Sequence, residues 1–154
     1  MTTQAQELNQ DFLADYDERV IALAQHLGLN LEPDFSNVDE EATQEEQEEQ
    51  RADAILEVTR ELDSIVETFP NNFRYSNEEY LVLTDEEADE EEDRQLDNYI
   101  EWELDIPKHI RPYFDEEKWK DDARMDGRGH TLSSYDGCEY EETVEGTTYY
   151  IYRV

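Results

Sequence analysis

Eight of the nine residues from Asp85 to Asp93 are acidic, and this density of charge limits what the chain can fold into. The whole chain has 44 acids and 12 bases, a formal net charge of -32. Self-repulsion of this size opposes a compact state, whereas solubility needs a net charge of only about 2 to 8. Since 36% of the 154 residues are hydrophobic, a modest core is still possible. We therefore expect the charge itself to be used in the function.

Other features of the sequence exclude several classes of protein. The longest apolar run has five residues, Val20 to Ala24, far below the roughly 20 that cross a membrane, and the first ten residues lack a secretory signal. The single cysteine, Cys138, excludes an internal disulfide framework. Direct binding of nucleic acid requires Lys and Arg to neutralise the phosphates, so a chain with 44 acids and 12 bases is not expected to bind it. We expect a soluble cytosolic protein that binds no membrane and no nucleic acid directly, and whose partner is basic.

The first half of the sequence predicts two amphipathic helices. Apolar residues at spacings of three and four predict a helix over 5–27, which Gly28 ends, and a second stripe from Ala54 to Phe69 that Pro70 ends. The two stripes are expected to face each other as a helical hairpin. Between them, residues 39–50 hold seven acids and three glutamines. This acidic connector either extends the second helix backwards or forms a mobile loop.

The second half of the sequence predicts a mixture of strands and helices. Thr84 begins a Thr-x-x-Glu capping box, and Glu145 with Gly146 forms a hairpin turn between alternating segments. The expected elements are a strand at 80–83, a helix from Thr84 that Pro107 ends, a short helix at 114–125, a loop at 126–137, and strands at 140–144 and 147–153.

These patterns predict an α+β fold with two units. The first, residues 1–74, is an acidic helical domain. The second, residues 75–154, has two helices and an antiparallel sheet of two or three strands that ends in a β-hairpin.

The acids are concentrated in the first two thirds of the chain. Residues 1–107 contain 33 acids and five bases, a net charge of -28. At a rise of about 1.5 Å per residue, the 12 acids between Thr84 and Asp105 fall once every ~3 Å, close to the ~3.4 Å per phosphate of one DNA strand. A helix with this spacing imitates a phosphate backbone. The residues that we expect to bind the partner are Asp85, Glu86, Glu87, Asp89, Glu90, Glu91, Glu92, Asp93, Asp97 and Glu101, followed by Asp39, Glu40, Glu41, Glu45, Glu46, Glu48 and Glu49.

Three other interpretations compete with this one. The acids could form a solvated helix face and a linker. They could reflect adaptation to high salt, because the chain has only three lysines and salt screens repulsion. They could also form a weak, diffuse cation sink, although no segment has the ligand spacing of an EF-hand loop. We expect no built metal site and no cofactor.

An enzyme needs converging acid, base and nucleophile groups, and one loop brings such residue types together. Its glycines permit tight turns, and its Asp and Ser side chains bond the local backbone, so we interpret the loop as structural and the protein as a non-enzyme. The residues in question are Asp126, Arg128, His130, Ser133, Ser134, Asp136 and Cys138.

Three segments carry a resemblance to a known group. LVLTDEEADE at 81–90, DGRGHTLSSYDG at 126–137 and YYIYRV at 149–154 resemble small uncharacterised proteins of tailed bacteriophages. The likeness covers residues 78–154, and it implies a phage source without an activity. The acidic composition is also similar to phage DNA-mimic inhibitors of host defence, such as anti-restriction and anti-CRISPR proteins.

The leading hypothesis is a phage-encoded DNA mimic that acts in the host bacterial cytoplasm. It would occupy the basic groove of a nucleic-acid-binding defence protein, a Cas effector or a restriction enzyme. The alternative is an acidic adaptor or chaperone-like binder of a basic protein, without competition against nucleic acid. The sequence leaves open whether the chain forms a homodimer.

Overall fold

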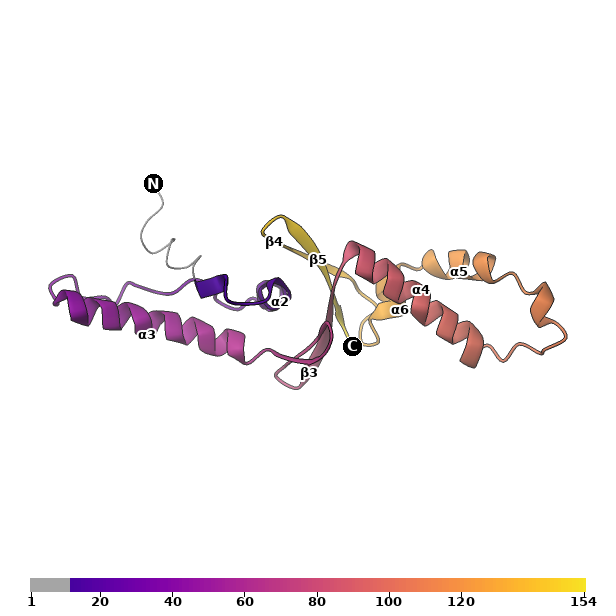
Figure 1. Cartoon of the computed structure of the whole chain (residues 1–154), viewed down its shortest axis with the longest axis horizontal. Coiled ribbons are helices and arrows are strands. Elements are labelled where there is room, and N and C mark those ends of the chain that lie inside the picture. Colours follow the sequence, from indigo (N-terminus) through magenta and orange to yellow (C-terminus); the bar gives the residue numbers. More distant parts are fainter. Residues whose placement is uncertain (1–11) are drawn as a thin grey trace.

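The computed structural model describes residues 12–154, which form an elongated α+β structure (Figure 1). A five-stranded sheet lies near the middle, with α3 toward one end and α4 and α5 toward the other (Figure 1). The elements are α2 (Glu18–Leu27), α3 (Gln44–Asp63), β1 (Val66–Phe69), β2 (Asn72–Tyr75), β3 (Glu78–Thr84), α4 (Asp85–Trp102), the 3-10 helix η1 (Arg111–Tyr113), α5 (Glu116–Arg124), α6 (Arg128–Leu132), β4 (Tyr140–Val144) and β5 (Thr147–Arg153).

The sheet is antiparallel throughout, in the order β1-β2-β3-β5-β4. The predicted hairpin of β4 and β5 is confirmed, with Glu145 and Gly146 both at positive φ, 48° and 82°, as a two-residue turn between twisted strands requires. The predicted strand at 80–83 is the centre of β3. The sheet has five strands, more than the two or three that the sequence predicted.

Helices cover both faces of the sheet, and β3 is buried between them. Side chains of a strand point alternately to opposite faces, so Tyr80 and Val82 join one buried cluster, while Leu81 and Leu83 join another. The first cluster contains the apolar face of α2 and the last turns of α3. The second contains Ala88 of α4 and Leu132 of α6.

Two expectations for the first half need correction. Residues 5–11 of the helix expected over 5–27 lie outside the described residues. Phe12 and Leu13 are helical, but residues 14–17 interrupt the helix, and α2 begins at Glu18, where the Asp17 side chain caps it by accepting from the Arg19 amide at 2.8 Å. It ends at Gly28, as predicted. The second helix stops at Asp63, and the expected helical residues Val66 to Phe69 form β1 instead, because they pair with β2.

The arrangement of these elements also differs from the predicted hairpin of two helices. The apolar face of α2 covers the sheet, and only the end of α3, with Val58 and Leu62, reaches the same core. Since β2 spans residues 72–75 and pairs with β3, the sheet crosses the boundary that the sequence suggested between residues 74 and 75.

The helices of the second half follow the predicted order with shifted ends. The Thr84 capping box is confirmed. However, α4 ends at Trp102 rather than near Pro107, because its last turn carries no base, and acids there oppose the helix dipole. Residues 128–132 of the expected loop form α6. Here Gly129 packs against the backbone so closely that a Cβ would lie 2.7 Å from the carbonyl carbon of Cys138.

Candidate functional site

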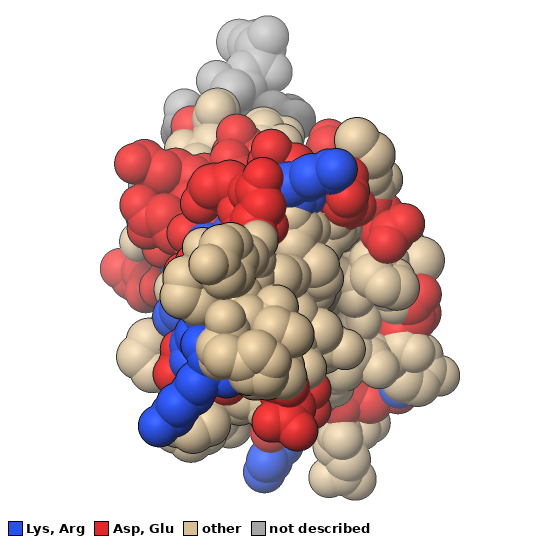
Figure 2. All heavy atoms as spheres, turned by 90° about the vertical axis from the view of Figure 1, so that its right-hand side faces the viewer, with Lys and Arg blue, Asp and Glu red and all other residues tan. Residues whose placement is uncertain are grey.

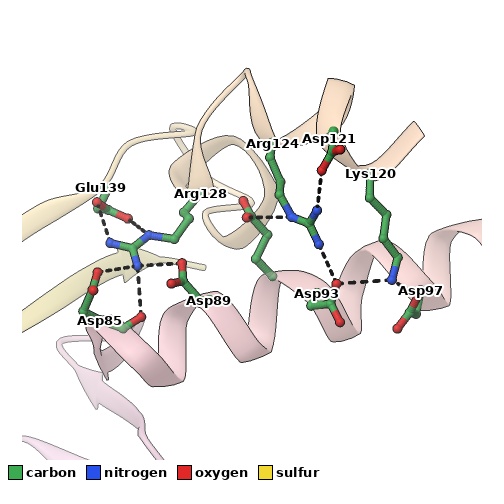
Figure 3. Close-up of polar contacts among 10 residues, drawn as sticks. Asp85, Asp89, Asp93, Asp97, Lys120, Asp121, Arg124, Arg128 and Glu139 are labelled. Atoms are coloured by element: carbon green, nitrogen blue, oxygen red, sulfur yellow. Dashed lines mark hydrogen bonds and ion pairs between the residues drawn. The ribbon is translucent and has the colours of Figure 1, made fainter. Parts of the chain in front are cut away.

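Four aspartates of α4 form a row at spacings of four residues, which we call the Asp ladder: Asp85, Asp89, Asp93 and Asp97. Three bases on the adjacent segment have the same spacing: Lys120, Arg124 and Arg128. The two rows run antiparallel and pair along their length (Figure 3). Residues four apart share one side of a helix, which aligns the four aspartates on α4 and Lys120 with Arg124 on α5, while Arg128 comes from the start of α6.

Arg128 holds the first turn of α4. Its guanidinium lies 2.7 Å from Asp85 Oδ1, 3.1 Å from Asp89 Oδ1 and 2.9 Å from Glu139 Oε2 (Figure 3). The side chain is only 15% exposed and also lies over the Tyr150 ring. Burial lowers the pKa of the Arg128 guanidinium. The hydrogen bonds to Glu139 and Asp85 raise it by more, so the net shift of this pKa is upward.

Lys120 and Arg124 hold the middle of α4. The Lys120 ammonium, on a side chain that is 7% exposed, lies 3.2 Å from Asp93 Oδ1 and also pairs with Asp97. Arg124 Nη2 donates to Asp93 at 2.6 Å (Figure 3). The hydrogen bond to Asp97 is the main reason that the pKa of Lys120 is raised.

Most of the other α4 acids are also neutralised within the chain. Glu87 pairs with Arg19 of α2 at 2.8 Å, and Glu91 and Glu101 pair with Arg94 and Arg111. Across residues 12–154, only Glu86 and Glu90 of the ten α4 carboxylates lie beyond ion-pair distance of a basic side chain. Five of the ten α4 carboxylates face Lys120, Arg124 and Arg128 of α5 and α6, so less of this helix is free to imitate phosphates than we expected.

Glu92 stands apart from the other α4 acids because it is buried, with 4% of its surface exposed. Its nearest cation is the Arg124 Nε at 3.9 Å, and its Oε2 has no hydrogen-bond partner among the described residues. Burial raises the pKa of this carboxyl. Glu92, one of the expected binding residues, is thus buried beside Arg124 of α5, and little of its surface is open to a partner.

The acids of α3, unlike those of the Asp ladder, are not paired with bases. They also form a row at spacings of four residues, which we call the α3 row: Glu45, Glu49, Asp53, Glu57 and Glu61. All five are exposed. In the part of the chain that the structure describes, no base lies within ion-pair distance of any of them. The α3 row therefore presents its full charge to solvent.

The charge of α3 extends over a long, exposed rod. Its 20 residues span about 30 Å and carry eight acids against Arg51 and Arg60. This is one carboxylate every ~4 Å, close to the ~3.4 Å per phosphate of one DNA strand. Residues 12–63 as a whole contain 16 acids and three bases, a net charge of -13. This long row of unpaired acids lies at the end of the molecule opposite α5 (Figure 1).

Glutamine side chains hold the acidic connector, residues 39–50, in place. The sequence allowed two forms for this segment, an extension of the second helix or a mobile loop. Residues 44–50 belong to α3, and Thr43 with Glu46 forms a capping box. Gln47 Nε2 donates to the carbonyls of Glu40 and Ala42, and the Asp39 amide donates to Gln50 Oε1 at 2.8 Å. The expected residues Asp39, Glu40 and Glu41 are thereby held beside the start of α3, next to Glu45, Glu46, Glu48 and Glu49.

The loop that carried the enzyme interpretation is held together by its own polar groups. Ser133 Oγ lies 2.8 Å from Asp136 Oδ1 and 2.7 Å from the Arg153 carbonyl. The Cys138 amide donates to Asp136 at 3.0 Å, and these bonds keep the pKa of Asp136 below its usual value. Arg128 is committed to the Asp ladder. Over residues 12–154, no group of three His, Cys, Asp or Glu side chains could hold a metal ion.

Sequence reasoning did not predict a cavity of about 700 Å³ that lies between α4, α5 and α6. The rings of Tyr99 and Trp119 stack with centroids 5.5 Å apart and form part of its wall, together with Leu96 and Ala123. Asp122 and Asp126 also line it. The spacing of Trp119, Asp122 and Ala123 along one face of α5 was the signal that could have revealed it.

Comparison with protein-family models, with curated proteins and with solved structures finds no match to this chain. No helix among residues 12–154 has the length and apolar character needed to cross a membrane.

Proposed function

We propose that this protein is a non-enzymatic inhibitor that uses uncompensated acids to occupy the basic, nucleic-acid-binding surface of a partner protein. The observation that carries the proposal is the contrast between the two acidic helices. The Asp ladder is paired with bases of its own chain, whereas within residues 12–154 no base lies within ion-pair distance of the α3 row.

A bare row of carboxylates at this spacing has a physical cost to the protein. Each like-charge pair four residues apart destabilises a helix by about 0.2 to 0.5 kcal/mol, and the α3 row contains four such pairs. Burial does not explain the row, since its five members are exposed. A basic partner surface would relieve this repulsion on binding. Binding such a surface is therefore a function that would account for the unpaired row.

The proposed mechanism follows from electrostatics. Carboxylates of α3 would take the places of phosphates opposite Lys and Arg of the partner, with bidentate contacts to Arg. The field of the α3 end would steer association and make it fast and strongly dependent on salt. The loss of binding with rising salt is therefore part of the proposal.

The resemblance of residues 78–154 to tailed-phage proteins gives the proposal its biological setting. We infer a partner among host defence proteins, a Cas effector or a restriction enzyme, met in the bacterial cytoplasm. In this proposal α4 has a smaller role than its acid density implied. Glu86 and Glu90 add to the negative charge that attracts the partner, while the Asp ladder joins α5 and α6 to α4.

An adaptor or chaperone-like binder of a basic protein is the second candidate, and one observation favours it. The end of the molecule formed by the α4 C-terminus and η1 exposes Trp102 and Tyr113, at 77% and 86%. Figure 2 shows uncharged atoms filling the centre of this end, with many acids above them. A mimic of nucleic acid needs no apolar surface, whereas an adaptor uses one.

Capture from a bacterial lysate tests the proposal. The tagged full-length chain is compared with an α3-neutral variant, E45Q/E49Q/D53N/E57Q/E61Q. The matched control variant, E67Q/E103Q/D105N/E117Q/E141Q, removes the same number of exposed acids elsewhere, and none of these forms an ion pair among residues 12–154. We expect the wild type and the control to capture a nucleic-acid-binding protein that duplex DNA and ~0.5 M salt displace, and the α3-neutral variant to lose it. Capture that DNA leaves unchanged would instead favour the adaptor.

A further inference from the structure

The cavity between α4, α5 and α6 combines aromatic walls with unpaired acids. Leu96 and Tyr99 come from α4, Trp119 and Ala123 from α5. Asp122 and Asp126 line the same cavity, and within the described chain neither forms an ion pair. The volume of about 700 Å³ is within the range of small-ligand sites, roughly 300 to 1,000 Å³.

The periodicity of α5 keeps the cavity negative. Lys120 and Arg124 lie four residues apart and both point to the Asp ladder (Figure 3). Trp119 and Asp122 lie on the neighbouring face and line the cavity. Lys120 and Arg124 therefore pair with α4, and the two carboxylates beside the aromatic wall have no ion-pair partner among residues 12–154.

This combination selects a particular chemistry. A flat guanidinium stacks on aromatic rings and pairs bidentately with carboxylates, and its three-carbon stem packs against apolar surface. An anionic group would be repelled by Asp122 and Asp126. A purely apolar group would leave both carboxylates beside it without a counter-charge.

We propose that this cavity binds an arginine side chain from a basic segment of the partner. The inference rests on the proposed function, because it assumes that the partner is basic, but it assigns a separate contact. The α3 row supplies long-range attraction, and the cavity, which we call the arginine cavity, would supply a specific anchor at the other end of the molecule.

The test uses a small probe and therefore does not require the partner. The full-length W102F variant leaves Trp119 as the only tryptophan, so its indole N–H gives one resonance in a ¹⁵N-edited NMR spectrum. N-acetylarginine amide is titrated into this protein, with N-acetylcitrulline amide as an uncharged analogue of the same shape. The same titration is run on W102F/D122N/D126N and on W102F/D53N/E57Q, which removes two distant acids.

We expect the arginine probe to shift the Trp119 resonance saturably and citrulline to leave it unchanged. Loss of two partly exposed ion pairs in D122N/D126N should weaken binding by about tenfold, and D53N/E57Q should leave it within about twofold. No saturable shift, equal binding of citrulline, or equal weakening by D53N/E57Q would overturn the inference. Neither Asp122 nor Asp126 makes a side-chain hydrogen bond within the described residues, so the fold should tolerate their substitution.

The two proposals fail separately. If arginine does not bind but the α3-neutral variant still loses the captured partner, only the arginine cavity is wrong. If arginine binds but neutralising α3 leaves capture unchanged, the proposed function is wrong and the cavity stands.

Discussion

Arg128 Nη1 donates to both the side chain and the backbone carbonyl of Asp85, at 2.7 and 3.0 Å, although 43 residues separate them. The first turn of the most acidic helix is thus fixed by a guanidinium from α6. Because the same nitrogen also reaches Asp89, a single base holds two steps of the Asp ladder. Many of the α4 acids therefore serve to bind bases of α5 and α6. For this reason we take α3, rather than α4, as the candidate binding surface.

Replacing Arg128 should destabilise the fold strongly. R128A leaves Asp85, Asp89 and Glu139 facing one another without their cation. We expect a loss of about 2 to 3 kcal/mol in the free energy of unfolding, below the ~3 to 5 kcal/mol of a fully buried pair because the aspartates are largely exposed. Urea denaturation measures it. The control R74A breaks a solvent-exposed pair with Glu79 and should cost at most about 1 kcal/mol; equal losses would contradict the role of Arg128.

Neutralising the two acidic rows should have opposite effects on stability. D89N/D93N/D97N strips partners from Lys120 and Arg124 and should lower the melting temperature. E49Q/D53N/E57Q removes all four like-charge pairs of the α3 row, a gain of about 1 to 2 kcal/mol at low salt. Thermal unfolding at low and ~0.5 M salt measures both, and the α3 gain should shrink as salt screens the row. A stabilised ladder variant would refute the assignment of the ladder to structure.

The pair between Glu87 and Arg19 should contribute its full stability above the ordinary pKa of a glutamate and lose it in acid. Burial raises the pKa of Glu87, but hydrogen bonds from Arg19 and Thr84 lower it more, so the net shift is downward. A carboxyl with a lowered pKa stabilises the fold above its unfolded pKa, and this contribution disappears as the pH falls through the folded pKa. E87Q keeps a capping-box side chain. We expect wild type to exceed E87Q by about 1 to 2 kcal/mol at pH 7 and to match it near pH 2, as followed by urea denaturation across pH.

Glu92 should show the reverse dependence. Burial raises its pKa, so the charged form is disfavoured in the folded protein, and stability is lost as the pH rises through the folded pKa. E92Q should therefore be more stable than wild type at pH 7, with a difference that vanishes once Glu92 is protonated in both states. Melting temperatures at pH 4 and pH 7 decide this. A less stable E92Q at pH 7 would mean that the charge is favourable to the fold through Arg124.

Local signals in the sequence predicted much of the fold. The capping box at Thr84 and the turn at Glu145 and Gly146 depend on neighbouring residues, and the structure has both where they were expected. Residues 66–69 were assigned to a helix because Val66 and Phe69 continue the spacing of the preceding stripe. Their strand conformation comes from pairing with β2, including Val66 with Arg74, and tertiary pairing overrides a short local pattern.

The candidate site was predicted less well, for a related reason. The acids were visible, but whether each is paired depends on residues far away, such as Lys120, which lies 27 positions from Asp93. Acid density alone does not distinguish a matched row from a bare one. The shared spacing of four in both rows was present in the sequence, but only the antiparallel packing of α4 against the segment from Lys120 to Arg128 shows that they meet.

The most direct test of the account is competition for nucleic acid on the captured partner. A fluorescently labelled duplex is bound to that partner, and its anisotropy is followed as wild type, the α3-neutral variant or the matched control variant is added. We expect wild type and the control to displace the duplex at similar concentrations, and the α3-neutral variant to need at least about tenfold more, since the loss of several charge contacts exceeds 1.4 kcal/mol. Displacement by the α3-neutral variant at the concentration of wild type would contradict the central role of α3.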